Sequence, residues 1–118
     1  MAAVSAFADP GHELAPERVA QLLSEGWQVI DVREDYEREA GHIAGTRHVA
    51  LERLASEAES IERSAPVIFY CRLGARSGMA TQAFRASGYD AYNMAGGITE
   101  WARRGLPLAP AGGYVADH

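Results

Sequence analysis

The stretch Val67-Ile68-Phe69-Tyr70-Cys71-Arg72-Leu73-Gly74-Ala75-Arg76-Ser77-Gly78 joins an apolar run to a polar loop that contains glycines. Its first four residues are bulky and apolar or aromatic, which is typical of a buried β-strand. After the loop, apolar residues recur at helical spacing as far as Ser87, and Gly88 follows as a stop. The stretch therefore predicts a strand, a loop and a helix, with the single cysteine of the chain where the strand ends.

The same alternation of short apolar runs and helical patterns continues on both sides of this stretch. Further strands are expected at residues 27–32, 47–51 and 90–94. Helical patterns are expected at residues 16–25, 34–39, 51–61 and 98–102, the second of them a single turn. This alternation predicts an α/β fold, a parallel sheet with helices on both faces. Such folds place their sites at the carboxyl ends of strands, and two polar clusters fall there, at residues 31–33 and 71–77.

Length and composition limit the functions that the chain can have. The 118 residues suffice for one domain, with 47% hydrophobic residues, 23% charged residues and a net charge of −5. No basic face is evident, so we expect no nucleic-acid partner. The first residues have neither a positive region nor a long apolar region, and no segment is apolar enough to cross a membrane, so we expect a cytoplasmic protein without a membrane partner. Residues 1–11 are expected to be flexible, residues 12–108 to form the domain, and residues 109–118 to form an extended tail.

The residue types exclude several kinds of site. All basic residues are arginines, so a lysine Schiff base is excluded. The only cysteine, Cys71, can form neither an internal disulfide nor a thiolate zinc site. The four histidines show no spacing typical of metal ligands, and we expect neither a metal nor another cofactor.

The loop that follows the strand has the features of a site for a thiolate and an anion. Backbone N–H groups of a tight loop, the N-terminal end of the following helix and the guanidinium groups of Arg72 and Arg76 all favour an ionised sulfur at Cys71. Gly74 permits backbone angles that other residues avoid. No histidine, aspartate or glutamate lies in the loop, so the reaction should need no general base. These features predict a nucleophilic cysteine that attacks a bound anion.

Spacing narrows the chemistry of this site. A phosphatase of the cysteine class has five residues between its cysteine and its arginine, whereas Arg76 comes one residue earlier here. Tyr70 also stands where such enzymes usually have a histidine. The shorter loop fits phosphate poorly, so an arsenate reductase or phosphatase is the weakest of the candidate functions.

The chain from about residue 12 to residue 107 resembles the single-domain rhodaneses, the thiosulfate sulfurtransferase family. Four stretches in the family's order carry the resemblance: Val29-Ile30-Asp31-Val32-Arg33, Gly41-His42-Ile43-Ala44-Gly45-Thr46, Tyr70 to Ser77, and Gly96-Gly97-Ile98-x-x-Trp101 with Gly105 and Pro107. Ala44 departs from the family pattern, which usually has proline there. The resemblance implies a rhodanese-like α/β fold with a central, mostly parallel sheet of about five short strands.

The resemblance also implies a reaction and its participants. Cys71 would take the outer sulfur of a small anionic donor such as thiosulfate and hold it as a persulfide. A thiophilic acceptor would then remove the sulfur. This acceptor would be either cyanide or a cellular thiol, and the thiol could belong to a thioredoxin-like or other sulfur-relay protein. The alternative is a persulfide carrier or regulatory module with little thiosulfate turnover. The residues expected to bind substrate around Cys71 are Arg72, Leu73, Gly74, Ala75, Arg76 and Ser77.

The roles expected of individual polar residues differ. We expect Arg76 to contact the anion or to brace the loop. Two roles remain open for Arg72: it contacts the substrate, or it points outward and steers donors or a partner. Asp31, Arg33 and His42 are expected to give structural support, because buried charges are usually paired. Ser77 is expected to cap the helix after the loop.

Overall fold

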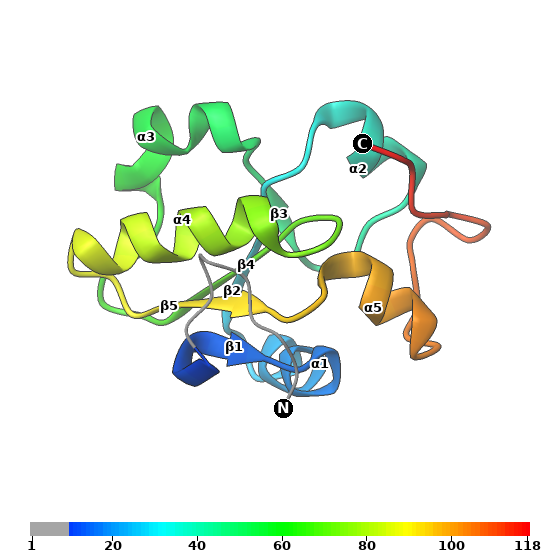
Figure 1. Ribbon diagram of the computed structural model, residues 1–118, viewed down its shortest axis with the longest axis horizontal. Helices are drawn as coiled ribbons and strands as arrows, with labels where there is room; N and C mark the ends of the chain where they lie inside the picture. The colour runs from blue at the N-terminus through cyan, green and yellow to red at the C-terminus, as the bar shows by residue number, and fades with distance from the viewer. Residues whose placement is uncertain (1–9) are drawn as a thin grey trace.

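A computed structural model describes residues 10–118 and contains one sheet of five strands, all parallel, in the order β1-β5-β4-β2-β3 (Figure 1). The strands are β1 (Glu13–Leu14), β2 (Gln28–Asp31), β3 (Arg47–His48), β4 (Val67–Tyr70) and β5 (Ala91–Met94). The predicted α/β class and its parallel sheet are confirmed. No helix within residues 10–118 is long and apolar enough to cross a membrane.

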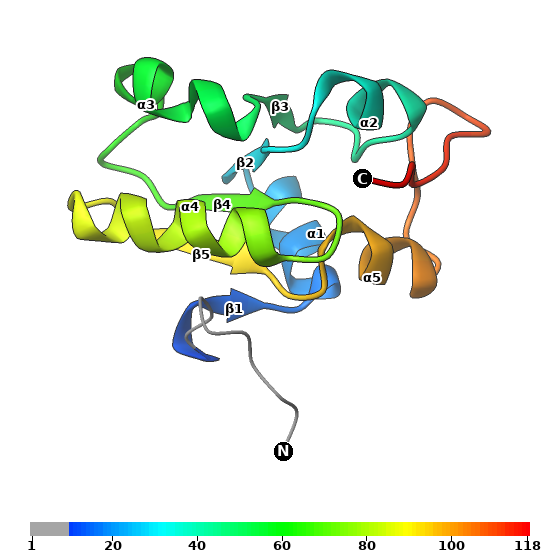
Figure 2. The same ribbon diagram turned by 45° about the horizontal axis from the view of Figure 1, so that its top comes forward.

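Helices cover both faces of this sheet (Figures 1 and 2). The α-helices are α1 (Pro16–Ser24), α2 (Asp35–Ala40), α3 (Leu54–Glu57), α4 (Ala75–Ala86) and α5 (Gly97–Arg103). Residues of α3 and α4 share one buried cluster with the sheet, and residues of α1 and α5 share the other. The sheet therefore has a hydrophobic core on each side.

Strand β4 lies between the two cores, and this position accounts for its uninterrupted run of apolar and aromatic residues. Val67 and Phe69 join the cluster of α3 and α4, whereas Ile68 and Tyr70 join the cluster of α1 and α5. Because side chains alternate between the two faces of a strand, a strand buried on both faces is apolar throughout. The next residue, Cys71, returns to the α3–α4 side.

The prediction of one continuous helix over residues 51–61 is wrong. The structure has a 3-10 turn (Leu51–Arg53), the short α3, and a second 3-10 turn (Ala58–Ser60). The hydroxyl groups of Ser56 and Ser60 donate to backbone carbonyls three residues earlier, at 3.0 and 2.6 Å. Serine side chains that bond locally to the backbone compete with regular helix geometry, which is consistent with this interruption.

Two strand predictions also need correction. Of the expected strand 47–51, only β3 is formed, although the N–H groups of Val49 and Leu51 still donate to β2 and the residue after it. The two-residue strand β1 at the sheet edge was missed, because Ala15-Pro16 follows it at once and leaves too few residues for a periodic pattern. Residues 1–11 were expected to be flexible. Of these, residues 1–9 lie outside the described part of the chain, and residues 10–12 form a 3-10 turn.

The C-terminal tail, residues 109–118, runs back across the molecule and ends beside α2 (Figure 1). Ala109 and His42 exchange two backbone hydrogen bonds of 2.8 and 2.9 Å, and the N–H of Tyr114 donates to the carbonyl of Ala40 at 2.9 Å. A Cβ at Gly41 would overlap the backbone of Tyr114, so this glycine leaves room for the tail. The tail is therefore docked near the carboxyl ends of the strands.

Candidate active site

Cys71 is the first residue after β4, and the residue is 1% exposed. Its sulfur accepts hydrogen bonds from the N–H of Gly74 at 3.0 Å, from the N–H of Ser77 at 3.5 Å and from the hydroxyl of Ser77 at 3.3 Å. Three donors from the next turn of chain thus converge on one sulfur atom. Such an arrangement stabilises negative charge on the sulfur.

The loop reaches this shape through a glycine at the start of α4. Gly74 is the residue before the helix and has φ of +110°, a conformation that side chains disfavour. Helix α4 therefore begins at Ala75, and the expectation that Ser77 caps it is wrong. Ser77 lies in the first turn, fully buried, where its hydroxyl faces the sulfur and the carbonyl of Gly74.

The start of α5 holds the other side of the same loop. The N–H groups of Ile98 and Thr99 donate to the carbonyls of Cys71 and Arg72, at 2.9 and 3.1 Å. Gly97 makes this approach possible, because a Cβ there would lie 2.6 Å from the carbonyl oxygen of Cys71. Two loop carbonyls are thus occupied by α5, while N–H groups of the loop turn toward the sulfur.

Asn93, the last residue but one of β5, adds a side-chain contact to the loop. Its amide nitrogen donates to the carbonyl of Gly74 at 3.2 Å and to the carboxylate of Glu13 at 3.0 and 3.2 Å. The pKa of Glu13 is raised because burial disfavours its charged form more than the contacts with Asn93 and His12 favour it.

Arg76, in the first turn of α4, pairs with α2. Its two terminal nitrogens donate to the two carboxylate oxygens of Glu37, at 2.8 and 2.9 Å. Burial opposes ionisation of Glu37, but the hydrogen bonds from Arg76 and from the N–H of Glu34 outweigh it and lower its pKa. Arg76 thus braces the loop against α2.

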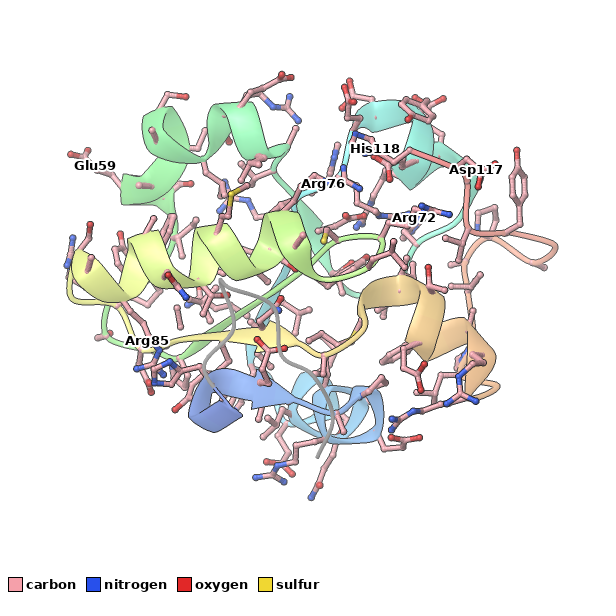
Figure 3. All side chains as sticks on the ribbon, viewed as in Figure 1. Glu59, Arg72, Arg76, Arg85, Asp117 and His118 are labelled. Atoms are coloured by element: carbon pink, nitrogen blue, oxygen red, sulfur yellow. The ribbon has the colours of Figure 1, made fainter. Side chains whose placement is uncertain are left out.

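Arg72 takes the outward side of the loop and meets the tail. A terminal nitrogen donates to Asp117 Oδ1 at 3.2 Å, and Figure 3 shows the two side chains together near His118. The Nε of Arg72 is buried and has no acceptor within residues 10–118. His118 in turn lies 3.3 Å from a carboxylate oxygen of Glu34.

Asp31 and Arg33 form a fully buried pair below the site. The Arg33 side chain donates to both oxygens of Asp31, at 2.9 and 2.8 Å, and to the carbonyl of Gly41 at 2.8 Å. His42 Nδ1 lies 3.2 Å from the carbonyl of Arg38. These contacts connect β2 with the turn after α2, and none of them reaches the sulfur of Cys71.

Tyr70 connects that turn to the reactive loop. Its hydroxyl accepts from the N–H of Ile43 at 3.2 Å and lies 3.1 Å from the hydroxyl of Thr46. Burial raises the pKa of Tyr70 to about 12, and the charge of Asp31 adds to the effect. The phenol is therefore a neutral hydrogen-bonding group immediately before Cys71.

A small cavity opens over the loop. It has a volume of about 190 Å³ and is lined by Cys71, Arg72, Leu73, Ala75, Arg76 and His118. A larger hollow of about 540 Å³ lies between α3 and α4, but its lining is mainly apolar and does not include Cys71. The smaller cavity is the candidate active site, because it is the one of the two that Cys71 lines.

One group of three potential metal ligands occurs within residues 10–118. Glu34, Glu37 and His118 each place a ligand atom within 4.8 Å of the others. Both oxygens of Glu37 already accept hydrogen bonds from Arg76, and His118 pairs with Glu34. Ion pairing accounts for this grouping, and we assign it no metal.

The Rhodanese-like domain model matches residues 15–104, which include the reactive loop and the two helices that contact it, α2 and α5. The chain belongs to the rhodanese-like family. It is 34% identical to the thiosulfate sulfurtransferase GlpE of Pseudomonas aeruginosa over 96 residues, which cover 80% of this chain and 87% of GlpE. It is 43% identical over 75 residues to the uncharacterized protein YqhL of Bacillus subtilis, a match that covers 63% of this chain and 60% of YqhL.

Solved structures agree with this membership at the level of the fold. A rhodanese-related protein from Thermoplasma volcanium superposes with a TM-score of 0.78 at 24% identity, covering 83% of this chain and 97% of that one. A rhodanese-like domain protein from Staphylococcus aureus gives a TM-score of 0.73 at 25% identity, covering 83% and 98%. The predicted family resemblance is thus confirmed.

Several residues at this rhodanese-like site were missed from the sequence: Glu37, Tyr70 as a bridge, Asn93, Asp117 and His118. Glu37 had a local signal, since it stands three residues after Glu34 in a capping-box arrangement at the start of α2. Asp117 and His118 had none, because their position depends on the path of the tail.

Proposed function

We propose that the protein is a sulfurtransferase that carries a sulfane sulfur on Cys71. The observation that supports this most directly is the convergence of three hydrogen-bond donors on the Cys71 sulfur, at the base of a small cavity. Donors fixed around the Cys71 sulfur favour its thiolate form, which is the form that attacks a sulfur donor. The identity to GlpE supports the same chemistry.

In the first step, the Cys71 thiolate attacks the outer sulfur of thiosulfate. A sulfur–sulfur bond forms to Cys71, the bond within thiosulfate breaks, and sulfite leaves with the electron pair. In the second step, cyanide or a thiolate attacks the outer sulfur of the persulfide and regenerates the Cys71 thiolate. No net proton transfer is needed with cyanide, and the scheme is a two-step exchange.

The acceptor must come from outside the chain, since Cys71 is its only cysteine. A thiol on a small molecule or on a thioredoxin-like or other sulfur-relay protein fits this requirement. The exposed side chain of Leu73 at the rim of the cavity gives such an acceptor an apolar contact next to the persulfide.

A persulfide carrier with little thiosulfate turnover is the second candidate. The pairing of Arg72 with Asp117 and of Arg76 with Glu37 favours it, because both loop arginines already have carboxylate partners. A phosphatase or arsenate reductase is disfavoured by the six-residue span from Cys71 to Arg76.

Mass spectrometry of the intact protein after incubation with thiosulfate tests the proposal. We expect the wild type to gain one sulfur atom, to lose it on addition of cyanide, and to release thiocyanate. Cys71→Ser should gain none. Turnover with thiosulfate supports the enzyme, whereas sulfur uptake only from a protein persulfide supports the carrier. A protein that gains no sulfur from any donor, or a Cys71→Ser variant that gains it equally, would overturn both.

A further inference from the structure

The two arginines of the Cys71 loop have carboxylate partners of opposite character. Glu37, the partner of Arg76, is 0% exposed at its side chain, whereas Asp117, the partner of Arg72, is 99% exposed. Figure 3 shows Asp117 on the tail, on the outer side of Arg72. The two pairs therefore differ in how readily an incoming anion can replace the carboxylate.

A substrate anion could replace Glu37 as the partner of Arg76 only at a large cost in free energy. It consists of two hydrogen bonds with good geometry, and Glu37 also accepts from the N–H of Glu34 at 3.0 Å. Displacement by a substrate anion would leave the Glu37 carboxylate buried without its cation, which is strongly unfavourable. Arg76 is thus committed to α2.

The pair of Arg72 and Asp117 is weaker in every respect. It has one contact of 3.2 Å, and the Arg72 side chain is 29% exposed. In this position Arg72 also keeps its Nε buried without an acceptor in the described chain, which costs free energy. A released Asp117 carboxylate would return to solvent at little cost.

Other contacts hold the Asp117 carboxylate close to Arg72 even when the pair is open. The Tyr36 hydroxyl donates to the backbone carbonyl of Asp117 at 3.1 Å, and the N–H of Tyr114 donates to Ala40. A carboxylate tethered in this way has a high effective concentration near the Arg72 guanidinium, where it competes with an incoming anion. The tail therefore presents a carboxylate to the guanidinium that borders the Cys71 cavity.

We infer that Arg72 is the cation that binds the anionic sulfur donor, and that Asp117 is a built-in competitor for the same guanidinium. This inference rests on the proposed sulfur transfer for its physiological meaning, but anion binding at Arg72 can be measured without that reaction. An incoming dianion such as thiosulfate displaces the Asp117 side chain, and the tail returns to Arg72 when the site empties. Asp117 then lowers the affinity of the site for its donor and so raises the donor concentration that the site requires.

Sulfate binding to the full chain tests this inference. Sulfate is a dianion of similar size to thiosulfate that cannot transfer sulfur, and Cys71→Ser removes the nucleophile. Binding is followed by the NMR shifts of the backbone amides of residues 72–76 at constant ionic strength, since salt screens exposed pairs. Asp117→Asn in this background should tighten sulfate binding about two- to fivefold, the scale of one exposed ion pair.

Two further variants make the test specific. Asp90→Asn removes a carboxylate from the exposed pair with Arg85, which Figure 3 shows at the opposite end of α4 from Arg72, and should leave sulfate affinity unchanged. Arg72→Gln should weaken binding and abolish the gain from Asp117→Asn when the two are combined.

The outcomes separate this inference from the proposed function. Unchanged or weaker sulfate binding in Asp117→Asn, a gain that persists without Arg72, or no measurable binding in any variant overturns the inference. If this pattern of affinities is found but the wild type never acquires a persulfide, the proposed function fails while the competition at Arg72 stands.

Discussion

Arg76 and Glu37 are joined by two hydrogen bonds of 2.8 and 2.9 Å, although they are 39 positions apart in the chain. The pair fixes the end of the Cys71 loop to the first turn of α2. The arginine that ends the sulfur-binding loop is thus held by a buried carboxylate.

The first prediction concerns the stability contributed by this pair. Arg76→Ala leaves the Glu37 carboxylate buried without its cation, and we expect the free energy of unfolding to fall by about 3 kcal/mol. Arg103→Ala is the control, because its pair with Glu100 lies at the surface, so the loss of that pair should destabilise the fold much less. Urea unfolding measures both values. An equal, small effect of the two substitutions would show that the Glu37 pair does not brace the fold.

The second prediction concerns the hydroxyl of Ser77. Ser77→Ala removes one of the three donors to the Cys71 sulfur while the N–H groups remain. Because hydrogen bonds to charged groups are the stronger ones, we expect persulfide formation to slow about tenfold. Ser56→Ala, on the distant α3, is the control. Single-turnover mass spectrometry gives the rates, and equal rates for the two variants would exclude a role of the hydroxyl.

The third prediction concerns stability in alkali. The pKa of Tyr70 is raised from 10.0 in the unfolded chain to about 12 in the fold, so the folded state retains a proton that the unfolded state releases. This stabilisation is complete below pH 10 and is lost as the pH rises through about 12, by up to about 3 kcal/mol.

Tyr70→Phe isolates this effect, because phenylalanine cannot ionise. The variant should be less stable at neutral pH, since Ile43 and Thr46 lose a hydrogen-bond partner, but its stability should fall less steeply between pH 10 and 12. Guanidinium unfolding at several pH values measures both slopes. Parallel curves for the two proteins would contradict a buried, neutral Tyr70.

The parts of the fold that could be predicted from sequence are those with local causes. Strand β4 is indicated by four consecutive apolar or aromatic residues, and Gly74, which donates to the Cys71 sulfur, is only three residues from Cys71 in the chain. The partners of the two loop arginines depend on the path of the chain between distant segments. Residues 34–39 include three glutamates, and the capping-box position distinguishes Glu37 locally but gives no sign that it pairs with Arg76.

The same limit applies to the tail. Residues 109–118 lack helical or strand periodicity, and their proline and glycine content indicates only an irregular segment. Their docked path depends on backbone hydrogen bonds to Ala40 and His42 and on the space at Gly41, none of which leaves a pattern in the tail itself. A single arginine and aspartate 45 residues apart carry no signal of their pairing.

The fourth prediction compares two glycines with similar φ angles and very different space around them. Gly97 and Gly105 both have positive φ, +64° and +78°, so alanine is strained by the backbone at either position. A Cβ at Gly105 meets nothing within 4 Å, whereas one at Gly97 would overlap the carbonyls of Cys71 and Arg72. We expect Gly105→Ala to cost about 1–2 kcal/mol and Gly97→Ala clearly more.

The two variants should also differ in activity. Gly97→Ala must push α5 away from the loop, and the hydrogen bonds from Ile98 and Thr99 that hold the loop carbonyls would lengthen or break. The donors around the Cys71 sulfur then lose their alignment, so sulfur uptake should slow in Gly97→Ala and stay near the wild-type rate in Gly105→Ala. Thermal unfolding and single-turnover sulfur uptake measure the two effects. Equal losses in both variants would mean that backbone strain alone explains Gly97, and that contact between α5 and the loop does not control the site.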